Sequence, residues 1–287
     1  MRNLRSIMER VASPLHITRS TGEQEPFDPQ RLRRSLEHAG ATPDVSERIA
    51  GAILPWIAQG MSTRKIYRKA FNLLSQRSKR LAARYSLKQA IMDLGPSGFP
   101  FERFIARILE KDGYRTQVGV ILAGKCVDHE VDVVAERNGN HFLIECKYHN
   151  SHGRFCDVKV PLYINSRFAD IAAAWREDGG SRKFDRGWVI TNTRFTSDAM
   201  KYGECAGLRM IGWDQPARGS LKERIDRSGL YPVTCMLTLS KAEKTRLLEK
   251  DVVLASEIIQ RPDLLSHALV RPEKTGSILR EAEELTA

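Results

Sequence analysis

Two acidic residues and one lysine near the middle of the chain have types and a spacing suited to chemistry at phosphorus. Asp132 and Glu145 lie on two strand-like segments that flank Asn138-Gly139, and Asn-Gly between such segments is the strongest short hairpin signal. A turn centred between Asn138 and Gly139 places Asp132 opposite Glu145, so both side chains project from one face. Lys147 lies two residues beyond Glu145 and therefore shares that face.

Two carboxylates and one ammonium on a sheet face predict a site for a hard divalent cation. Mg²⁺ binds one or two carboxylates and keeps water or phosphate oxygens as its other ligands. We therefore expect Asp132 and Glu145 to bind Mg²⁺, or Mn²⁺ in its place. The side chain of Cys146 must point to the opposite face, so only its backbone carbonyl could be a further metal ligand. Lys147 would position or deprotonate the water that a bound cation acidifies, or stabilise the transition state.

The elements that must position these residues form an α/β pattern. Five apolar residues at i, i+3, i+4, i+7 and i+8, from Phe101 to Leu109, predict an amphipathic helix that Gly113 ends. Short β-rich segments follow, and a helix is expected at roughly 160–178. A helix, three strands, a helix and two strands predict a layered α/β domain with a mixed sheet. The predicted strands are Tyr114 to Ile121, Val131 to Ala135, His141 to Cys146, Gly187 to Thr193 and Leu208 to Trp213.

The two ends of the chain are predicted to be mostly helical. In the first third, a β-hairpin-like lead precedes a helix that Asp28 caps and Pro29 begins. Further apolar residues at helical spacing include Ile49, Ile53, Trp56 and Ile57. Three or four short helices are expected in the tail, the first opening with the capping box Ser240-x-x-Glu243.

Charge is distributed unevenly along the chain. Its 287 residues carry a net charge of +11, and residues 1–100 hold 17 basic and 8 acidic residues. Net charge falls to +2 in residues 101–220 and to zero in the remainder. A basic chain favours polyanionic partners such as nucleic acid or nucleotides. The excess in the first third predicts a nucleotide-phosphate or DNA contact there, although a solvated helix face would have the same composition.

Residues 97–215 resemble the Mrr-like branch of the PD-(D/E)xK restriction endonucleases. The resemblance rests on Gly98-Phe99-Pro100-Phe101-Glu102, Val131-Asp132-Val133-Val134, Ile144-Glu145-Cys146-Lys147 and Trp188-Val189-Ile190-Thr191-Asn192-Thr193. It implies that Asp132 and Glu145 hold the metal, that Lys147 is catalytic and that Glu102 assists from the helix. His129-Glu130-Val131 precedes the Asp where the superfamily name has Pro, at a position that is tolerant in this branch.

Two other patterns carry less weight. Gly119 to Cys126 nearly matches a phosphate-binding loop, but its residues are strand-like and Cys126 replaces the hydroxyl that such a loop needs. Cys146, His149, His152 and Cys156 have loosely zinc-like spacing. Because Cys146 should point away from the two histidines, we expect no zinc site there, and His149 and His152 are interpreted as loop residues near the mouth of the active site.

Residues 16–94 resemble the ATP-cone, the regulatory nucleotide-binding domain of ribonucleotide reductases. The similarity lies in Ile17-Thr18-Arg19-Ser20-Thr21-Gly22, Phe27-Asp28-Pro29-Gln30-Arg31-Leu32 and Ser62-Thr63-Arg64-Lys65-Ile66-Tyr67. It implies ATP or dATP as a regulatory ligand. Arg19 and Arg31 would meet phosphates, beside the turn at Gly22, while Ile17, Thr63, Ile66 and Tyr67 would line the adenine pocket. The chain departs from the family at Ser20 and Thr21, where a second basic residue and an acid are usual.

These patterns together predict an α+β/α/β multidomain protein. The expected parts are a lead at 1–15, a mostly helical ATP-cone at 16–94, a restriction-endonuclease-like α/β domain with a mixed sheet at 95–218, and a small helical domain at 219–287. The predicted activity is Mg²⁺-dependent hydrolysis of DNA, with restriction of foreign DNA as the biological setting. The alternative is a non-catalytic, nucleotide-sensing DNA-binding regulator on a nuclease-like scaffold.

The remaining expectations concern assembly and compartment. Cutting both DNA strands with one active site per chain requires two chains, so a homodimer or higher homo-oligomer is expected. The five cysteines are an odd number without the dense spacing of a disulfide scaffold. Neither a signal-peptide core nor a run of about 18 apolar residues occurs. A cytoplasmic protein with reduced thiols and no membrane partner is therefore expected.

Overall fold

The computed structural model describes residues 15–19, 22–177 and 183–286. The chain divides into two compact units, unit 1 at Met1–Ser86 and unit 2 at Leu87–Ala287. Nearly all of the predicted lead, together with Ser20 and Thr21 of the predicted turn, lies outside the described residues. None of the described helices is long and apolar enough to cross a membrane.

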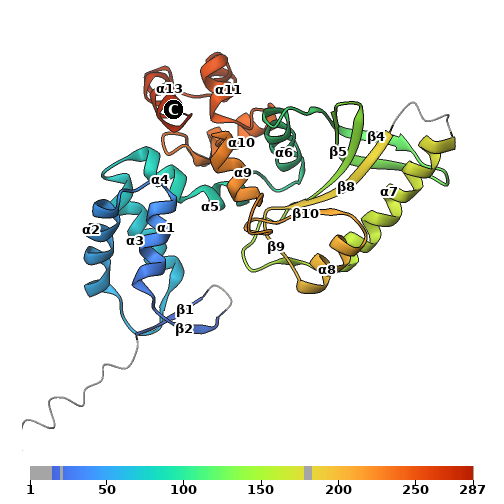
Figure 1. The fold of residues 1–287 in the computed structure, drawn as a ribbon. Helices are drawn as coiled ribbons and strands as arrows, with labels where there is room; N and C mark the ends of the chain where they lie inside the picture. The colour runs from blue at the N-terminus through green and yellow to red at the C-terminus, as the bar shows by residue number, and fades with distance from the viewer. Residues whose placement is uncertain (1–14, 20–21, 178–182, 287) are drawn as a thin grey trace, which may run out of the picture. The chain divides into compact units, whose positions relative to one another are not determined.

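The described part of unit 1 combines a small sheet with helices (Figure 1). Asp28 caps the first helix by accepting the backbone N–H of Gln30 at 2.9 Å, which confirms the predicted helix start. The helical spacing predicted through Trp56 and Ile57 runs too far: the helix ends at Ile53, a 3₁₀ turn containing Pro55 follows, and Trp56 is 41% exposed. The sheet order is β2-β1-β3. The elements are β1 (His16–Thr18), β2 (Gln24–Pro26), α1 (Pro29–His38), α2 (Pro43–Ile53), η1 (Leu54–Trp56), β3 (Met61–Ser62), α3 (Thr63–Ser75) and α4 (Lys79–Tyr85).

Unit 2 is built on a five-stranded mixed sheet of order β10-β8-β6-β5-β4. Strand β5 pairs antiparallel with both β4 and β6, whereas β8 pairs parallel with both β6 and β10. The predicted α/β domain with a mixed sheet is therefore confirmed. The sequence pattern missed helix α8, which Thr196 caps, and the short β7-β9 sheet. The elements are α5 (Leu87–Met92), α6 (Phe99–Lys111), β4 (Arg115–Ala123), β5 (Asp128–Arg137), β6 (Asn140–Lys147), β7 (Phe155–Cys156), α7 (Lys159–Glu177), β8 (Lys183–Thr191), β9 (Arg194–Phe195), α8 (Ser197–Cys205) and β10 (Arg209–Ile211).

Helices cover the sheet as separate layers. Helix α6 packs on β4, β5 and β6 and also contacts α9, whereas α7 packs on β8 and contacts α8 (Figure 1). Under α7 the core includes Leu143, Phe168 and Val189. Gly187 lets α7 approach closely, because a Cβ added there would lie 2.4 Å from the ring of Phe168.

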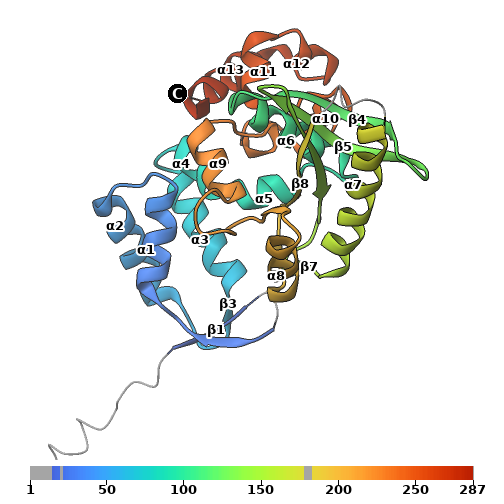
Figure 2. The same cartoon turned by 45° about the vertical axis from the view of Figure 1, so that its right-hand side comes forward.

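Short helices end the chain within unit 2, next to α6 (Figure 2). Ser240 and Glu243 form the predicted capping box. Arg107 of α6 pairs with Glu257 at 3.3 Å, which ties this segment to the first helix of the α/β layer. The elements are α9 (Leu221–Ser228), η2 (Val233–Cys235), α10 (Lys241–Glu249), α11 (Ala255–Gln260), α12 (Leu264–His267) and α13 (Pro272–Thr286).

Candidate active site

The β5-β6 hairpin has the register that its turn predicts. Val133 pairs with Ile144, and this register continued by one residue sets Asp132 opposite Glu145. Asn138 and Gly139 both have positive φ, 54° and 76°, as a two-residue type I′ turn requires. The backbone N–H of Cys146 also donates to Asp132 Oδ2 at 2.7 Å. The two strands are thus held together where the candidate residues lie.

Glu145 is the buried centre of the site, with 3% of its surface exposed. The Lys147 ammonium contacts its Oε1, and a guanidinium N–H of Arg167 donates to its Oε2 at 3.0 Å. A buried carboxylate is stable when it is paired and hydrogen-bonded. Both oxygens of Glu145 are therefore satisfied by cations on the α7 side of the sheet.

Arg167 of α7 is a site residue that the motif did not reveal. Besides Glu145, its guanidinium contacts the backbone carbonyl of Glu130, and it lies 5.5 Å from the ring of Tyr163. Its side chain is only 14% exposed. The signal in the sequence is positional: Arg167 follows Ile164 by three residues and precedes Ile171 by four. It therefore sits in the buried stripe of the helix, where a lone arginine needs an acidic partner.

Several carboxylates lie close enough together at the site to shift one another's pKa. Burial, followed by the negative charges of Asp132, Glu130 and Glu145, raises the pKa of Glu102 in the first turn of α6 to about 7. Burial and the charge of Glu145 raise the pKa of Asp132 to about 6. A bound cation would offset the repulsion between these carboxylates and so favour their ionised forms.

Lys147 is held in its charged form. Burial alone would lower its pKa, but the hydrogen bond to Glu145 and the charges of Glu145 and Asp132 outweigh burial and raise the pKa above its ordinary value. An ammonium with a raised pKa does not act as a general base near neutral pH. Of the functions expected for Lys147, this geometry favours positioning of water or phosphate and stabilisation of charge.

Polar residues at the end of β8 fix the backbone that follows Lys147. The Thr191 hydroxyl donates to the Lys147 carbonyl at 2.7 Å. The buried Asn192 side chain accepts from His149 N at 2.9 Å and donates to His149 O at 2.7 Å. The Thr-Asn-Thr segment, part of the sequence resemblance, therefore supports the end of the strand that carries Glu145 and Lys147.

The donor set fits a magnesium-like cation. Asp132 and Glu145 supply carboxylate oxygens, and Cys146, whose side chain is buried, has a backbone carbonyl between Glu145 and Lys147. Within the described residues, no cluster of three or more His, Cys, Asp or Glu side chains could hold a metal ion. Mg²⁺ needs only one or two carboxylates, because it retains waters. A bound ion would share Glu145 with Lys147 and Arg167.

The structure shows where the residues of the phosphate-loop-like and zinc-like sequence patterns lie. Residues 119–123 belong to strand β4, so no phosphate loop and following helix occur there. His149 Nε2 lies 3.4 Å from Cys156 Sγ, while His152 Nε2 lies 2.8 Å from Gln89 Oε1. The two histidines thus have different partners and do not converge on a zinc-like site.

The residues expected at the nucleotide site lie around the small sheet of unit 1. Strand β1 pairs in parallel with β3, which brings Ile17 beside the start of α3 and hence near Thr63. Arg19 and Arg31 both pair with Glu25, at 3.4 and 3.0 Å. Ile17 and Ile66 are buried in the core, and Gly22 has a φ of 90°. The ring of Tyr67 stacks on that of Tyr85, with centroids 5.0 Å apart.

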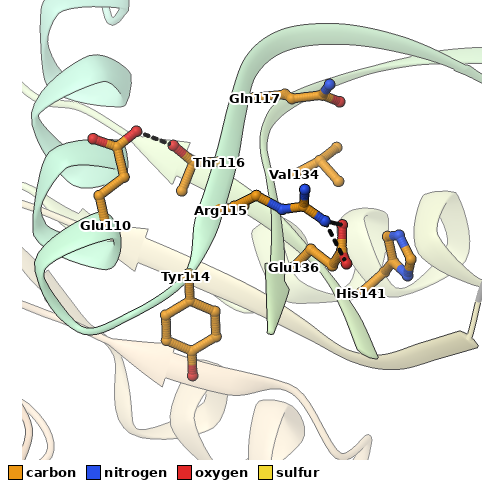
Figure 3. A pocket seen from close by; sticks show the side chains of 8 residues that line it. All are labelled: Glu110, Tyr114, Arg115, Thr116, Gln117, Val134, Glu136 and His141. Atoms are coloured by element: carbon orange, nitrogen blue, oxygen red, sulfur yellow. Dashed lines mark hydrogen bonds and ion pairs between the residues drawn. The ribbon is translucent and has the colours of Figure 1, made fainter. Parts of the chain in front are cut away.

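A separate pocket of about 520 Å³ lies toward the turn end of the hairpin (Figure 3). Arg115 spans its wall by pairing with both oxygens of Glu136 at 3.0 Å, and Glu110 accepts from the Thr116 hydroxyl at 2.6 Å. Neither Asp132 nor Glu145 lines this pocket. The catalytic candidates are therefore not part of it.

The chain has a relative of shorter length in Archaeoglobus fulgidus. This uncharacterised protein is 32% identical over 182 residues, which make up 63% of the present chain and 99% of the relative. Residues 231–286 also match the family described as AF1548-like, C-terminal. The chain belongs to the AF1548-like family. The crystal structure of AF1548, a protein of unknown function, aligns with this structure at a TM-score of 0.56 and 30% sequence identity. The alignment covers 66% of this chain and 98% of AF1548.

The AF1548-like chain also contains a restriction-endonuclease-like domain. Residues 95–216 match the Mrr_cat family, described as restriction endonuclease. This range includes Glu102, Asp132, Glu145, Lys147 and also Arg167. A further solved structure, the MspJI restriction endonuclease in complex with a 27-mer oligonucleotide, aligns with a TM-score of 0.33 at 15% identity over 74% of this chain and 44% of MspJI. That likeness is too low to bear on function.

Proposed function

We propose that this protein is a metal-dependent DNA endonuclease of the restriction type. One observation carries the proposal: Asp132, Glu145 and Lys147 share one face of the β5-β6 hairpin, away from its turn, in a domain that matches restriction endonucleases. A degenerate scaffold has no structural need for a buried carboxylate that two cations must neutralise. The set of side chains is therefore better explained by chemistry at a phosphate than by packing.

Each residue of the site would have a different role in hydrolysis. Asp132, Glu145 and the Cys146 carbonyl would hold Mg²⁺ or Mn²⁺, which supplies an acidified water and neutralises charge on the phosphate. The Lys147 ammonium donates hydrogen bonds to that water or to a phosphate oxygen. Glu102, with a pKa of about 7, can take up and release a proton near neutral pH. Arg167 keeps the Glu145 carboxylate oriented.

We also propose that unit 1 binds ATP or dATP and that the active form is a homodimer. The nucleotide proposal rests on the resemblance to the ATP-cone and on Arg19 and Arg31, two cations that approach each other at Glu25. A triphosphate could displace Glu25 and bind both guanidiniums. The dimer follows from the need to cut two strands with one site per chain.

A cleavage assay on plasmid DNA tests these proposals together. The full chain is incubated with plasmid and either Mg²⁺ or EDTA, with and without ATP or dATP. We expect linear or nicked product only with the metal, at a rate that nucleotide changes. Absence of cleavage under every condition, combined with salt-dependent DNA binding, would instead support the non-catalytic, nucleotide-sensing regulator.

A further inference from the structure

A long stretch of unit 1 and its junction with unit 2 is free of acidic residues. Residues 48–92 contain ten lysines and arginines and no aspartate or glutamate. Four of the ten lie on the first two turns of α3: Arg64, Lys65, Arg68 and Lys69. We propose that the exposed face of α3 binds the phosphate backbone of duplex DNA. This inference adds a binding surface to the proposed endonuclease and therefore rests on that function.

The geometry of α3 gathers these cations on one side. Ile66, Ala70 and Leu74 form the buried stripe of the helix. At 3.6 residues per turn, the four cations fall within an arc of about 140° on the opposite side. Arg64, Lys65 and Arg68 are exposed, and Lys69 lies 5.8 Å from the ring of Trp56. Arg77 and Lys79, also exposed, continue the basic surface beyond the end of α3.

The cations of α3 lack the acidic partners that arginines of α1 and α2 have. Arg33 pairs with Glu47, Arg34 with Asp28 and Arg48 with Asp44. Among the residues that the structure describes, no salt bridge involves the four cations of α3. Like charges at i and i+4, as in Arg64/Arg68 and Lys65/Lys69, disfavour a helix. A row of this kind is expected where an external polyanion neutralises it.

The shape of the surface favours duplex DNA over other polyanions. A helix of 13 residues is about 20 Å long, and its cations are spread over successive turns, as are the phosphates of a duplex backbone. A single nucleotide offers one compact phosphate cluster. A membrane-surface helix needs a free apolar face, whereas the apolar face of α3 is buried in the core.

The test measures DNA binding by the full chain without cleavage. Anisotropy of a labelled 30-bp duplex is followed in EDTA over a range of NaCl concentrations. The test variant carries Arg64→Gln, Lys65→Gln and Arg68→Gln; Lys69 is kept because it contacts Trp56. The control carries Arg33→Gln, Arg34→Gln and Arg48→Gln, so it loses the same charge from the same unit. Melting curves establish that both variants fold. A third, lysine variant carries Arg64→Lys and Arg68→Lys and keeps the charges.

We expect DNA binding to weaken in the α3 triple variant and not in the control. Removing three phosphate contacts should lower the slope of log K against log [NaCl] by about 2.7 and weaken binding roughly tenfold or more at 0.1 M salt. The control should change the slope by less than one, and the lysine variant should bind like the wild type. Equal losses in the two triple variants, or no loss in either, would overturn the proposal. So would tighter binding to duplex RNA or to phosphatidylserine vesicles than to duplex DNA.

The outcome is independent of whether the chain cuts DNA. If the wild type binds through α3 but never cleaves, the endonuclease proposal fails and the surface stands. If it cleaves and the α3 variant binds normally, the surface fails and the endonuclease stands.

Discussion

Arg167 donates a hydrogen bond to Glu145 Oε2 at 3.0 Å, from a helix that follows the strand bearing Glu145. This bond joins α7 to the sheet at the candidate metal site, and both side chains are largely buried. Lys147 contacts the other oxygen of the same carboxylate. The orientation of Glu145 therefore depends on two cations, one from the strand and one from the helix.

Removing the guanidinium should impair cleavage more than folding or DNA binding. Arg167→Met leaves a charge-assisted hydrogen bond unmade, which is worth about 1.5–3 kcal/mol, so we expect a loss of roughly 10–100-fold in the rate constant for cleavage. Arg167→Lys should recover part of it. Rate constants under single-turnover conditions and duplex affinity in EDTA provide the check. A variant that cleaves at the wild-type rate would show that Arg167 does not position Glu145.

Cleavage should rise with pH across the neutral range. Asp132 and Glu102 have pKa values raised to about 6 and about 7, so each carboxyl loses its proton only above its ordinary range. The deprotonated forms attract the cation. At fixed, subsaturating Mg²⁺, we expect the rate to increase from pH 5.5 to 8. In Glu102→Gln the rise should centre near pH 6, and a profile identical to the wild type would refute the assignment.

Metal binding should stabilise the protein, and more strongly at pH 8 than at pH 5.5. A carboxyl whose pKa is higher in the folded than in the unfolded state stabilises the fold at a pH below its unfolded-state pKa. This stabilisation is lost as the pH rises through the folded-state pKa. For Glu102 the loss occurs between about pH 4.5 and about pH 7. Mg²⁺ at ten times its Kd would add about 1.4 kcal/mol, or about 3–5 °C in Tm. Differential scanning fluorimetry of the wild type and Asp132→Asn measures this. Equal shifts in both proteins would place the metal elsewhere.

Packing of α7 on β8 should tolerate no side chain at residue 187. A Cβ on Gly187 would lie 2.4 Å from Phe168 and 2.8 Å from Leu208, so Gly187→Ala should lower the free energy of unfolding by about 1–3 kcal/mol. Gly276 of α13 is the matched control in the same unit, since it is exposed and has no atom within 4 Å of an added Cβ. Gly276→Ala should stabilise by up to about 1 kcal/mol. Urea denaturation gives both values, and an unchanged midpoint for Gly187→Ala would contradict the packing.

The structural features that could be predicted from the sequence are those set by residues close together along the chain. Asn138-Gly139 can form a tight hairpin because both residues tolerate positive φ, and that turn sets the register of Asp132 and Glu145. Asp28 with Pro29 and Ser240 with Glu243 mark helix starts through backbone hydrogen bonds within a few residues. The mixed sheet follows from the order of helical and strand patterns.

What the sequence could not supply depends on contacts between distant segments. The pairing of Arg167 with Glu145 requires α7 to lie on the sheet, which hydrophobic periodicity does not specify. The helical spacing of Ile49, Ile53 and Trp56 also continues past the end of the helix, which stops at Ile53 before a 3₁₀ turn. The raised pKa of Glu102 likewise depends on burial in the folded chain and on carboxylates of other elements.

The most direct test is cleavage of a labelled duplex in Mg²⁺ by the wild type, Asp132→Asn and Lys147→Met, under single-turnover conditions. The wild type should cut the duplex, and EDTA should stop it. Each variant should lose at least about 10³-fold in rate, since it lacks a metal ligand or the ammonium that stabilises charge on the phosphate, while its melting temperature shows that it still folds. Cleavage by both variants at the wild-type rate, or no cleavage by a wild-type protein that binds the duplex, would contradict the proposed active site.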